Sequence, residues 1–446
     1  MCYHAECENG RRLGSLNTTE KKESLWSMLL SIPSFWKAQM SDWKVTVVRT
    51  SLERLGYQII YPYLSLYIVA LGAQKTQLGL ITSISMILAG LLGPITGFFI
   101  DRNGAKKVYI AGILMLFASY ILYASAPTWH LCVVAMIVYY LGSGTGGHSC
   151  GTICGNCLTN CDRAKGMLIC ESLAAGLLGM IGPMLAAFIL LRIVGVDEAA
   201  AGADELKYLF YVSAFFTLVS LIVVVCKLSN QKWAVKNKLG TNALKQSMEI
   251  LKGNKYARRW IVISAVNNLP MAMVLPYTQV FAGEVKGASV AVLAAMVTAC
   301  SLTSVFCGYP VGALADRFGR KKVLYVTLPL YWLSNILLVL APSQATLIVA
   351  GVLSGFYYIS SPLSAAIQRE LVSQEVMGTW LGVTRLTNAI VAAVMALLAG
   401  IIYDKIGPQY VFIIFVALDA LVRMPLLISL PETLHMKKQE EDSCCS

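Results

Sequence analysis

The chain has 446 residues, of which 57% are apolar and only 13% are charged. Soluble globular proteins have about 45–50% apolar and about 25% charged residues, so this composition excludes a soluble enzyme and indicates a chain that faces lipid. A membrane-spanning helix uses about 20 apolar residues, which leaves room for on the order of twelve spans. The net charge of +12 does not indicate nucleic-acid binding, because basic residues gather in the cytoplasmic loops of multispanning proteins.

Apolar windows separated by polar connections predict an all-α membrane protein of twelve helices. In chain order the predicted spans are 44–71, 78–100, 108–125, 130–157, 164–191, 207–228, 260–282, 290–315, 323–341, 346–368, 377–403 and 408–430. The long polar stretch in the middle divides them into two sets of six. The predicted parts are an N-terminal segment (1–43), a first bundle (44–228), a central loop (229–259), a second bundle (260–430) and a tail (431–446).

The distribution of Lys and Arg supports this arrangement of spans. One side of the predicted membrane carries 27 basic residues and the other carries five, while four lie within spans. The positive-inside rule therefore predicts a multi-pass protein, in the cell membrane, with both termini and the central loop in the cytoplasm.

The two sets of six spans contain an internal repeat at an offset of 215 residues. A motif of the form Gly-x-x-x-Asp-Arg-x-Gly-x-Lys-Lys lies between spans 2 and 3 and again between spans 8 and 9. Its residues are Gly97, Asp101, Arg102, Gly104, Lys106 and Lys107 in the first copy, and Gly312, Asp316, Arg317, Gly319, Arg320, Lys321 and Lys322 in the second. The match without a gap indicates that the two halves are copies of one another.

This duplicated motif in a six-plus-six chain resembles the major facilitator superfamily of secondary transporters, and within it the drug:proton antiporters. The resemblance implies two pseudo-symmetric six-helix bundles that rock around a central cavity. It also implies a monomer whose partners are a small-molecule substrate, protons and the lipid bilayer. In this fold Asp101 would meet the start of span 11 and Asp316 the start of span 5, so that the motifs act as conformational latches.

Two departures from the antiporter pattern are visible. Many proton-driven drug exporters carry an Arg in span 4 where this chain has Val138, Tyr139 and Tyr140. In span 5 the Gly182-Pro183 pair is present, but Ala186 and its neighbour replace a Gly pair. Both departures weaken the interpretation as a proton-coupled drug exporter, and neither indicates another function.

Ionisable residues inside the spans are candidates for function, because a charge at mid-bilayer costs several kcal/mol unless it is paired or hydrated. Glu171 and Arg385 lie at similar depths in spans 5 and 11, which flank the cavity in the resembled fold, so they could meet across it. Arg49 and Glu53 are four residues apart and could neutralise each other, as could Asp419 and Arg423 in span 12. The candidates for proton coupling are Glu171, Arg385, Glu53 and Arg54.

Polar uncharged residues in the spans are candidates for the substrate cavity. Pro270 and Pro276 predict a bent span 7, whose freed backbone groups would face a cavity. Spans 1, 4, 7 and 10 line the cavity in the resembled fold, and interfacial placement is the alternative for each tyrosine. The candidates are Tyr57, Gln58, Tyr61, Tyr139, Tyr140, Asn267, Asn268, Tyr277, Tyr357, Tyr358 and Asn388.

Span 4 also carries His148 and four cysteines at helical spacing, Cys150, Cys154, Cys157 and Cys161. Four thiols on one straight helix cannot converge on one tetrahedral ion. The adjacent ridge Gly147, Gly151 and Gly155 favours close helix packing instead. We therefore expect no metal site here, with a soft-metal or redox role as the alternative.

The sequence thus predicts a transporter of a small organic solute that works by alternating access, with proton-coupled efflux preferred. The alternatives are a metabolite or sugar importer of the same fold, a transport-inactive receptor or scaffold, and a thiol-dependent metal carrier. No nucleophile–base set, phosphate loop or cofactor fingerprint stands out, so neither an enzyme nor a cofactor is expected, and no nucleic acid is expected as a partner.

Overall fold

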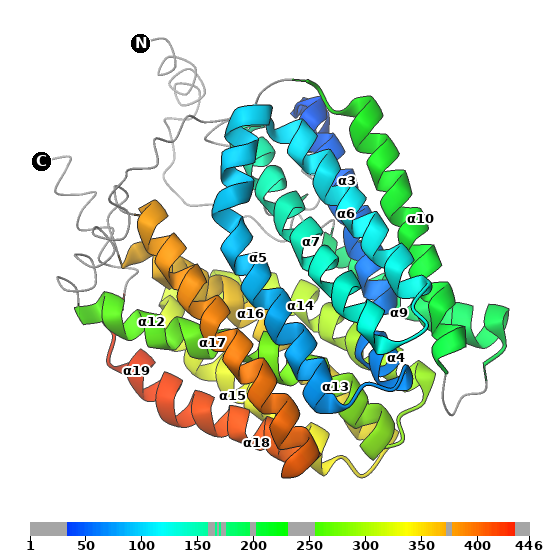
Figure 1. The fold of residues 1–446 in the computed structure, drawn as a ribbon. Coiled ribbons are helices and arrows are strands. Elements are labelled where there is room, and N and C mark those ends of the chain that lie inside the picture. Colours follow the sequence, from blue (N-terminus) through cyan, green and yellow to red (C-terminus); the bar gives the residue numbers. More distant parts are fainter. Residues whose placement is uncertain are drawn as a thin grey trace, which may run out of the picture. The chain divides into compact units, whose positions relative to one another are not determined.

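The computed structural model describes residues 34–158, 166, 169–170, 175–196, 202–230, 255–371 and 377–432. The chain forms two compact units, 1–39 and Met40–Ser446. In the first unit residues 34–38 are helical. All further description concerns the second unit, whose described residues form helices and no strands (Figure 1).

Each of the twelve predicted spans contains helix, and the all-α membrane class is confirmed. Within the described residues, ten helices are long and apolar enough to cross a membrane. The helices of the first half are α3 (Ser41–Ile60), α4 (Leu64–Ala70), α5 (Lys75–Asn103), α6 (Ala105–Ala124), α7 (Trp129–Cys157), α9 (Ala175–Phe188), the π-helix η2 (Ile189–Val194) and α10 (Ala203–Lys227). Those of the second half are α12 (Lys255–Asn267), η3 (Pro270–Val274), α13 (Leu275–Val280), η4 (Phe281–Val285), α14 (Val290–Phe318), α15 (Arg320–Leu340), α16 (Gln344–Glu370), α17 (Met377–Lys405), α18 (Pro408–Leu418), η6 (Asp419–Arg423) and α19 (Met424–Ile428).

The structure reproduces the internal repeat at atomic detail. Helix α14 begins and ends 215 residues after α5, at Val290 and Phe318 against Lys75 and Asn103. The Ser119 hydroxyl donates to the Ala135 carbonyl at 2.7 Å, and the repeat-related hydroxyl of Ser334 donates to the carbonyl of Ala350 at the same distance. The first bond joins α6 to α7 and the second joins α15 to α16, which are the third and fourth spans of each half. The two halves therefore share their packing as well as their sequence.

The repeated loop motif ties each half together through its first lysine. Lys106 donates to the Leu228 carbonyl at 2.6 Å, just after α10, and Lys321 donates to the Ile428 carbonyl at 2.8 Å, the last residue of α19. Cations at helix C-termini satisfy orphan carbonyls and oppose the negative end of the helix dipole. Gly104 and Gly319 form the turns with φ of +85° and +105°, a region that residues with a Cβ rarely occupy.

The close packing of α7 uses different glycines from those that the sequence indicated. A methyl group at Gly142 would lie 2.8 Å from the Gly112 carbonyl of α6, and one at Gly146 would meet the Arg49 guanidinium. Among the described residues, in contrast, no neighbouring side chain or helix lies within 4 Å of a methyl group added at Gly147 or Gly151. The expectation of a packing ridge at Gly147 and Gly151 was therefore wrong; α6 packs on the neighbouring face.

Span 7 is bent at its proline as predicted, and span 1 is interrupted at a proline as well. Helix α3 ends at Ile60 and α4 begins at Leu64, with Pro62 in the turn between them. In span 7 the α-helix stops at Asn267 and continues through the π-helical segment that starts at Pro270. Proline removes a backbone donor, and π-helical turns are frequent at functional sites.

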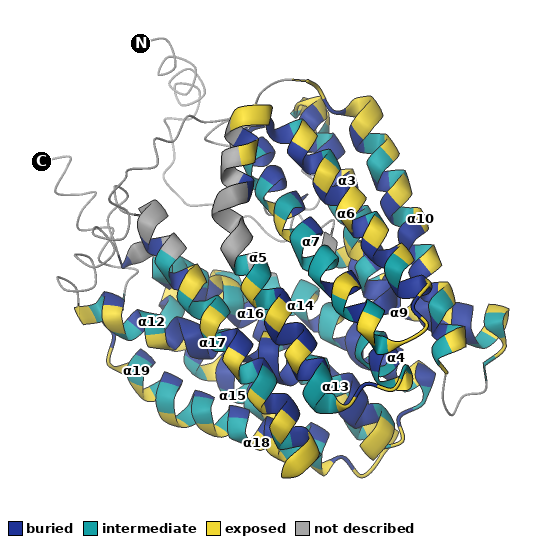
Figure 2. Ribbon diagram, viewed as in Figure 1, coloured by how far each residue is buried: buried dark blue, intermediate teal, exposed yellow. Residues whose placement is uncertain are grey.

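Large apolar side chains are exposed along the outer helices, as expected for a surface that meets hydrocarbon. Figure 2 shows exposed positions recurring along α10, where Tyr211, Phe215 and Ile222 are more than half exposed. A soluble monomer rarely exposes apolar patches of this extent. This surface therefore supports the assignment to the membrane.

A buried ion pair connects three helices of the second half. Arg423 Nη1 lies 3.2 Å from Asp419 Oδ1, and Trp332 of α15 donates to Asp419 Oδ2 at 2.6 Å. Arg423 Nη2 also donates to the Ser364 hydroxyl of α16 at 3.2 Å. Since these contacts lie within the half and are buried or partly buried, the pair holds α15, α16 and the last span together.

Replacing Arg423 by Leu should destabilise the protein strongly, because Asp419 would remain buried without its cation. Breaking a buried pair costs about 3–5 kcal/mol, so the thermal unfolding midpoint of the detergent-solubilised variant should fall well below that of the wild type. The matched control is Lys207→Leu, which removes the exposed pair with Asp204 and should cost at most about 1 kcal/mol. Equal midpoints for the two variants would contradict the structural role.

Candidate functional site

The candidate site lies between the two halves, which meet along two helix pairs. Helix α5 packs against α17, and α9 packs against α14; Figure 1 shows the first pair side by side. Because the repeat relates span 2 to span 8 and span 5 to span 11, these two contacts are copies of one interface. Residues that project between these pairs from both halves are therefore the ones to consider for a shared site.

One end of this interface is closed by a symmetric pair of tyrosines. We call it the distal end, the end that holds connections 71–74, 286–289 and 406–407. Tyr63 donates to the carbonyl of Val290, the first residue of α14, at 2.9 Å. Tyr277 donates to the carbonyl of Lys75, the first residue of α5, at 3.1 Å. Each half thus donates one hydrogen bond to the start of the repeat-related helix in the other.

Close packing and further polar contacts complete this closure, which we call the distal seal. Asp404 accepts hydrogen bonds from the backbone N–H of Thr76 at 2.7 Å and from its hydroxyl at 2.6 Å. Lys75 forms an ion pair with Glu284 at 2.9 Å. A methyl group at Gly79 would clash with the Ala396 carbonyl. The helices of the two halves therefore touch almost backbone to backbone at this end.

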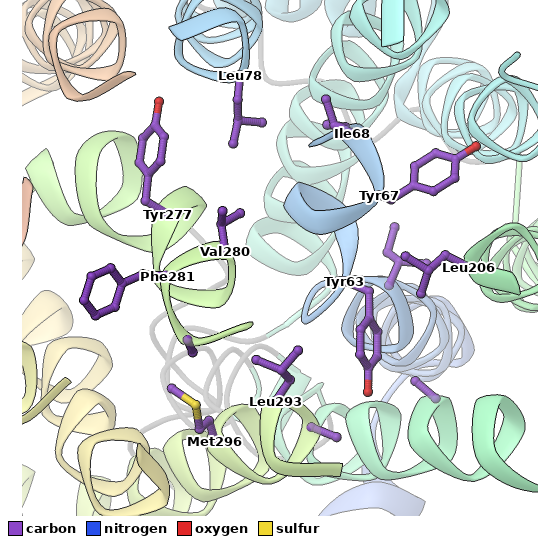
Figure 3. Packing of buried hydrophobic residues seen from close by; sticks show 14 of the residues in the cluster. Tyr63, Tyr67, Ile68, Leu78, Leu206, Tyr277, Val280, Phe281, Leu293 and Met296 are labelled. Carbon is purple, nitrogen blue, oxygen red and sulfur yellow. The ribbon is translucent and has the colours of Figure 1, made fainter. Parts of the chain in front are cut away.

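Apolar residues fill the space beneath the seal. Figure 3 shows Leu78 and Ile68 from the first half near Val280 and Leu293 from the second, with Tyr277 beside them. All five are at most 4% exposed, and they belong to one continuous cluster that includes both halves. This end of the interface is therefore packed as closely as the core of a protein.

Six tyrosines form a cluster deeper between the halves, which we call the central tyrosine cluster. Tyr57 stacks on Tyr139 with ring centroids 5.6 Å apart and lies 5.4 Å from Tyr61. Tyr139 and Tyr140 meet edge to face at 5.7 Å, and the same arrangement holds for two tyrosines of α16 at 5.1 Å. The members are Tyr57, Tyr61, Tyr139, Tyr140, Tyr357 and Tyr358.

This cluster bridges the two halves. Tyr61 from the first half and Tyr358 from the second interact through their hydroxyl groups. Five of the six members keep part of their surface exposed, and only Tyr357 is buried. The six come from spans 1, 4 and 10, and the structure therefore brings together six of the seven tyrosines that the sequence predicted for a cavity.

Arg54 lies beside the central tyrosine cluster without a partner of its own. It is exposed and makes no hydrogen bond or ion pair with the residues that the structure describes. Its charge acts on Tyr57 of the first half and on Tyr358 and Cys300 of the second. It stands thirteen residues into α3, roughly 20 Å along the helix. A cation at this depth must be hydrated or bind an anion.

Glu53, the neighbouring candidate, is paired. Its carboxylate contacts the Arg49 guanidinium one helical turn earlier. Arg49 is 2% exposed, and its guanidinium lies 4.6 Å from the centre of the Tyr109 ring. Glu53 retains 19% of its side-chain surface exposed, so the pair is buried at its basic end and accessible at its acidic end.

Of the second pair of coupling candidates, Glu171 and Arg385, the structure describes only Arg385. Glu171 lies outside the described residues, so its predicted meeting with Arg385 stays a prediction. Arg385 of α17 is exposed, and its charge acts on His148 of α7, across the interface between the halves. Among the described residues it has no ion pair. Within the described part of the chain, Arg385 is thus a second cation between the halves that has no ion pair.

Three of the amide side chains that the sequence predicted for the cavity offer free acceptors. The carbonyl oxygens of Gln58, Asn267 and Asn388 are buried and have no hydrogen-bond partner among the described residues. Asn388 donates through its amide nitrogen to the Ser264 hydroxyl at 2.8 Å. Asn268, in contrast, donates to the Ser264 carbonyl of its own helix at 2.8 Å. Buried acceptors without partners are rare, so the first three are available to a bound solute.

Other predicted site residues lie elsewhere. Tyr277 was expected at the cavity, but its hydrogen bond and its stacking on Tyr403 at 5.3 Å place it in the distal seal. The side chains of the predicted latch residues Asp101 and Asp316 lie outside the described residues. The sequence analysis missed Tyr63, although Pro62–Tyr63 and Pro276–Tyr277 occupy the two repeat-related bends, which would have indicated the pair.

Comparisons with known proteins agree with this architecture. The sequence matches the family profile of the Major Facilitator Superfamily over residues 50–295 and 261–443. A comparison with curated protein sequences finds no match.

Similar solved structures include the nucleoside transporter NupG, with a TM-score of 0.67, 15% identity and coverage of 88% of this chain and 100% of that one. A D-xylose–proton symporter has a TM-score of 0.70, 15% identity and coverage of 88% and 98%. The human organic anion transporter MFSD10 (TETRAN) has a TM-score of 0.60, 17% identity and coverage of 87% and 99%. At these identities the likeness shows the fold alone.

Removing both tyrosine hydroxyls from the distal seal should favour a state that is open at this end. The double variant Tyr63→Phe and Tyr277→Phe loses two cross-half hydrogen bonds, each with a net value of about 0.5–1.5 kcal/mol. Spin labels on ketone-bearing unnatural residues at the exposed distal positions Ser125 and Gln344 report the separation of the halves by pulsed electron resonance. A longer-distance component should appear or grow.

The control for this measurement is Tyr410→Phe, which alters an exposed tyrosine near the same end. It should leave the distance distribution unchanged. A distribution for the double variant identical to that of the wild type would show that the two hydroxyls do not hold the seal.

Proposed function

The chain belongs to the major facilitator superfamily, and from this premise we propose that it is a secondary transporter that moves a small organic anion by alternating access. The observation that carries the substrate class is Arg54, an exposed and unpaired cation at the centre of the membrane-spanning region, between the two halves. Substrate sites of this fold class lie near the bilayer midplane at the interface of the repeats.

The balance of charge in the site supports an anion. Arg54 and Arg385 contribute one cation from each half, and neither has an ion pair among the described residues. Glu53, the acidic candidate of span 1, is already neutralised by Arg49. A guanidinium binds a carboxylate or phosphate through two parallel hydrogen bonds. A bound anion would supply the charge that the site lacks.

The rest of the site supports an organic solute with a planar group. The rings of the central tyrosine cluster offer faces and edges for stacking, an arrangement worth about 0.5–1.5 kcal/mol per aromatic pair beyond burial. The free amide oxygens of Gln58 and Asn267 can accept hydrogen bonds from hydroxyl or amino groups. Small inorganic ions would use neither feature.

Proton coupling and export are the finer parts of the proposal. Glu53 is the candidate for proton coupling because 19% of its side-chain surface is exposed, and a proton that binds its carboxylate would take the place of Arg49 as the neutralising charge. Export rests on the Gly182-Pro183 segment of span 5, which packs against Gln58. Import of a metabolite is the competing direction, and a transport-inactive receptor is the competing class; imposed gradients of both signs distinguish all three.

Arg54→Gln should abolish preferential binding of anions. A thermal-shift screen of the purified protein would pair each aromatic carboxylic acid with its methyl ester, since a ligand that binds the folded state raises the unfolding midpoint. In the wild type the acids should stabilise and the esters should not. In the variant the dissociation constant for the best acid should rise about 10–100-fold, as expected when a charge-assisted bond of about 1.5–3 kcal/mol is lost.

The control is Arg192→Gln, which removes an exposed cation at the last turn of η2 and should bind like the wild type. If the wild type is stabilised by esters as well as by acids, or by neither, the proposed substrate class is wrong.

Glu53→Gln should separate transport from its driving force. In proteoliposomes with an imposed pH gradient, the variant should lose gradient-driven accumulation of the acid found above, because it cannot release a proton. Exchange of labelled for unlabelled acid at equal pH should continue. The control Glu205→Gln changes an acidic residue in the first turn of α10 and should keep both activities; gradient-driven accumulation by Glu53→Gln would remove it as the coupling residue.

A further inference from the structure

Three cysteine thiols from two spans converge inside the first half. Cys150 and Cys154 lie one turn apart on α7, and Cys170 comes from span 5. All three are buried, and their sulfur atoms lie within 4.8 Å of one another. The cysteines of span 4 alone cannot converge on one point, because they lie along one straight helix. The neighbouring span supplies the third ligand that one helix could not.

The cluster is fixed in place by span 1. The Thr50 hydroxyl lies 3.7 Å from the sulfur of Cys150 and 3.7 Å from that of Cys170. Trp43 donates from its indole nitrogen to the carbonyl of Gly166 at 3.2 Å, which anchors span 5 just before Cys170. Helices of spans 1, 4 and 5 therefore hold the three thiols from separate directions.

A buried cation with free donors stands beside the thiols. The Arg49 charge acts on Cys150, and its guanidinium packs against Gly146, one turn before Cys150 on α7. Arg49 is 2% exposed, yet its Nε and Nη2 atoms have no hydrogen-bond partner among the described residues. Glu53 uses only Nη1. A neighbouring guanidinium stabilises a thiolate, which is the form in which cysteine binds a metal.

We propose that Cys150, Cys154 and Cys170 bind one soft monovalent metal ion, with Cu(I) as the ion that the site fits. Soft thiol ligands select Cu(I) over hard cations. Zinc requires four ligands, commonly all Cys or His, and among the described residues three sulfur atoms converge here. On binding, the coordinating thiols lose their protons to solvent and form Cu–S bonds as thiolates. The charge of Cu(I) and the nearby Arg49 guanidinium oppose the negative charge of these thiolates.

The position of the cluster makes the ion a resident of the protein and not its cargo. The thiols and Thr50 all belong to the first half, so the rocking of one half against the other would leave their geometry unchanged. A transported ion would have to contact both halves, as the proposed anion does beside Arg54. Bound copper would join spans 1, 4 and 5 and stabilise the first half.

The test is an anaerobic titration of the full-length protein in detergent with Cu(I), using bicinchoninate as the competing chelator. Cys2, Cys7, Cys444 and Cys445 are replaced by Ser so that the terminal thiols do not compete. We expect one ion per chain, and an X-ray absorption spectrum with three sulfur neighbours. Cys150→Ser, Cys154→Ser and Cys170→Ser should each lower the affinity about 100-fold. Loss of a residue that only hydrogen-bonds to a metal ligand already costs about 10–100-fold, and these residues are the ligands themselves.

Cys132→Ser removes a buried thiol of α7 outside the cluster and should bind copper like the parent. Size-exclusion profiles and unfolding midpoints without metal show that each variant is folded, and copper should raise the midpoint of the parent and of Cys132→Ser only. The proposal is overturned if the parent binds no copper, or if the three cluster variants bind it as tightly as the parent. It is also overturned if thiol titration of protein prepared in air shows Cys150 and Cys170 joined as a disulfide.

Discussion

The structure depends on one constraint: a charge or polar group held in a hydrocarbon environment needs a partner, water or a ligand. Asp419 and Arg423 meet it fully, through each other, Trp332 and Ser364, and their role is to hold helices together. Arg54 does not meet it within the described residues. The difference between satisfied and unsatisfied groups separates the scaffold of this protein from its site.

The internal repeat divides the residues in the same way. Positions that support the architecture are duplicated: the lysines that cap the last helix of each half, the serine bonds between third and fourth helices, and the Pro–Tyr bends of the distal seal. The charged residues beside the candidate site are not duplicated, since the offset of 215 places Asn268 and Leu269 opposite Glu53 and Arg54. Duplication preserved the frame, and the chemistry that selects a solute resides where the copies differ.

Sequence predicted the elements well and their orientation poorly, for a physical reason. Hydropathy, charge, motif spacing and proline positions can be read directly from the sequence, so they located twelve spans, the repeat and the bend at Pro270. They did not indicate which side of a helix faces a neighbour, because a membrane helix is apolar towards lipid and towards protein alike. For this reason Gly147 was mistaken for a packing residue in place of Gly142, and Tyr277 for a cavity residue. Cys170 was missed because its partners lie on another helix.

The distal seal is suited to reversal. Its polar contacts are two tyrosine bonds, the Asp404–Thr76 contacts and the Lys75–Glu284 pair; an intramolecular hydrogen bond contributes about 0.5–1.5 kcal/mol net, and exposed ion pairs about 0–1 kcal/mol. Their sum is a few kcal/mol, the size of the gap between exchanging conformations. Because the bonds are symmetric copies at repeat-related helix starts, a rotation that breaks one strains the other, which makes opening cooperative. A ligand that bridges the two halves near Arg54 and Tyr358 acts on the same balance, so a modest preference for one state is enough to shift it.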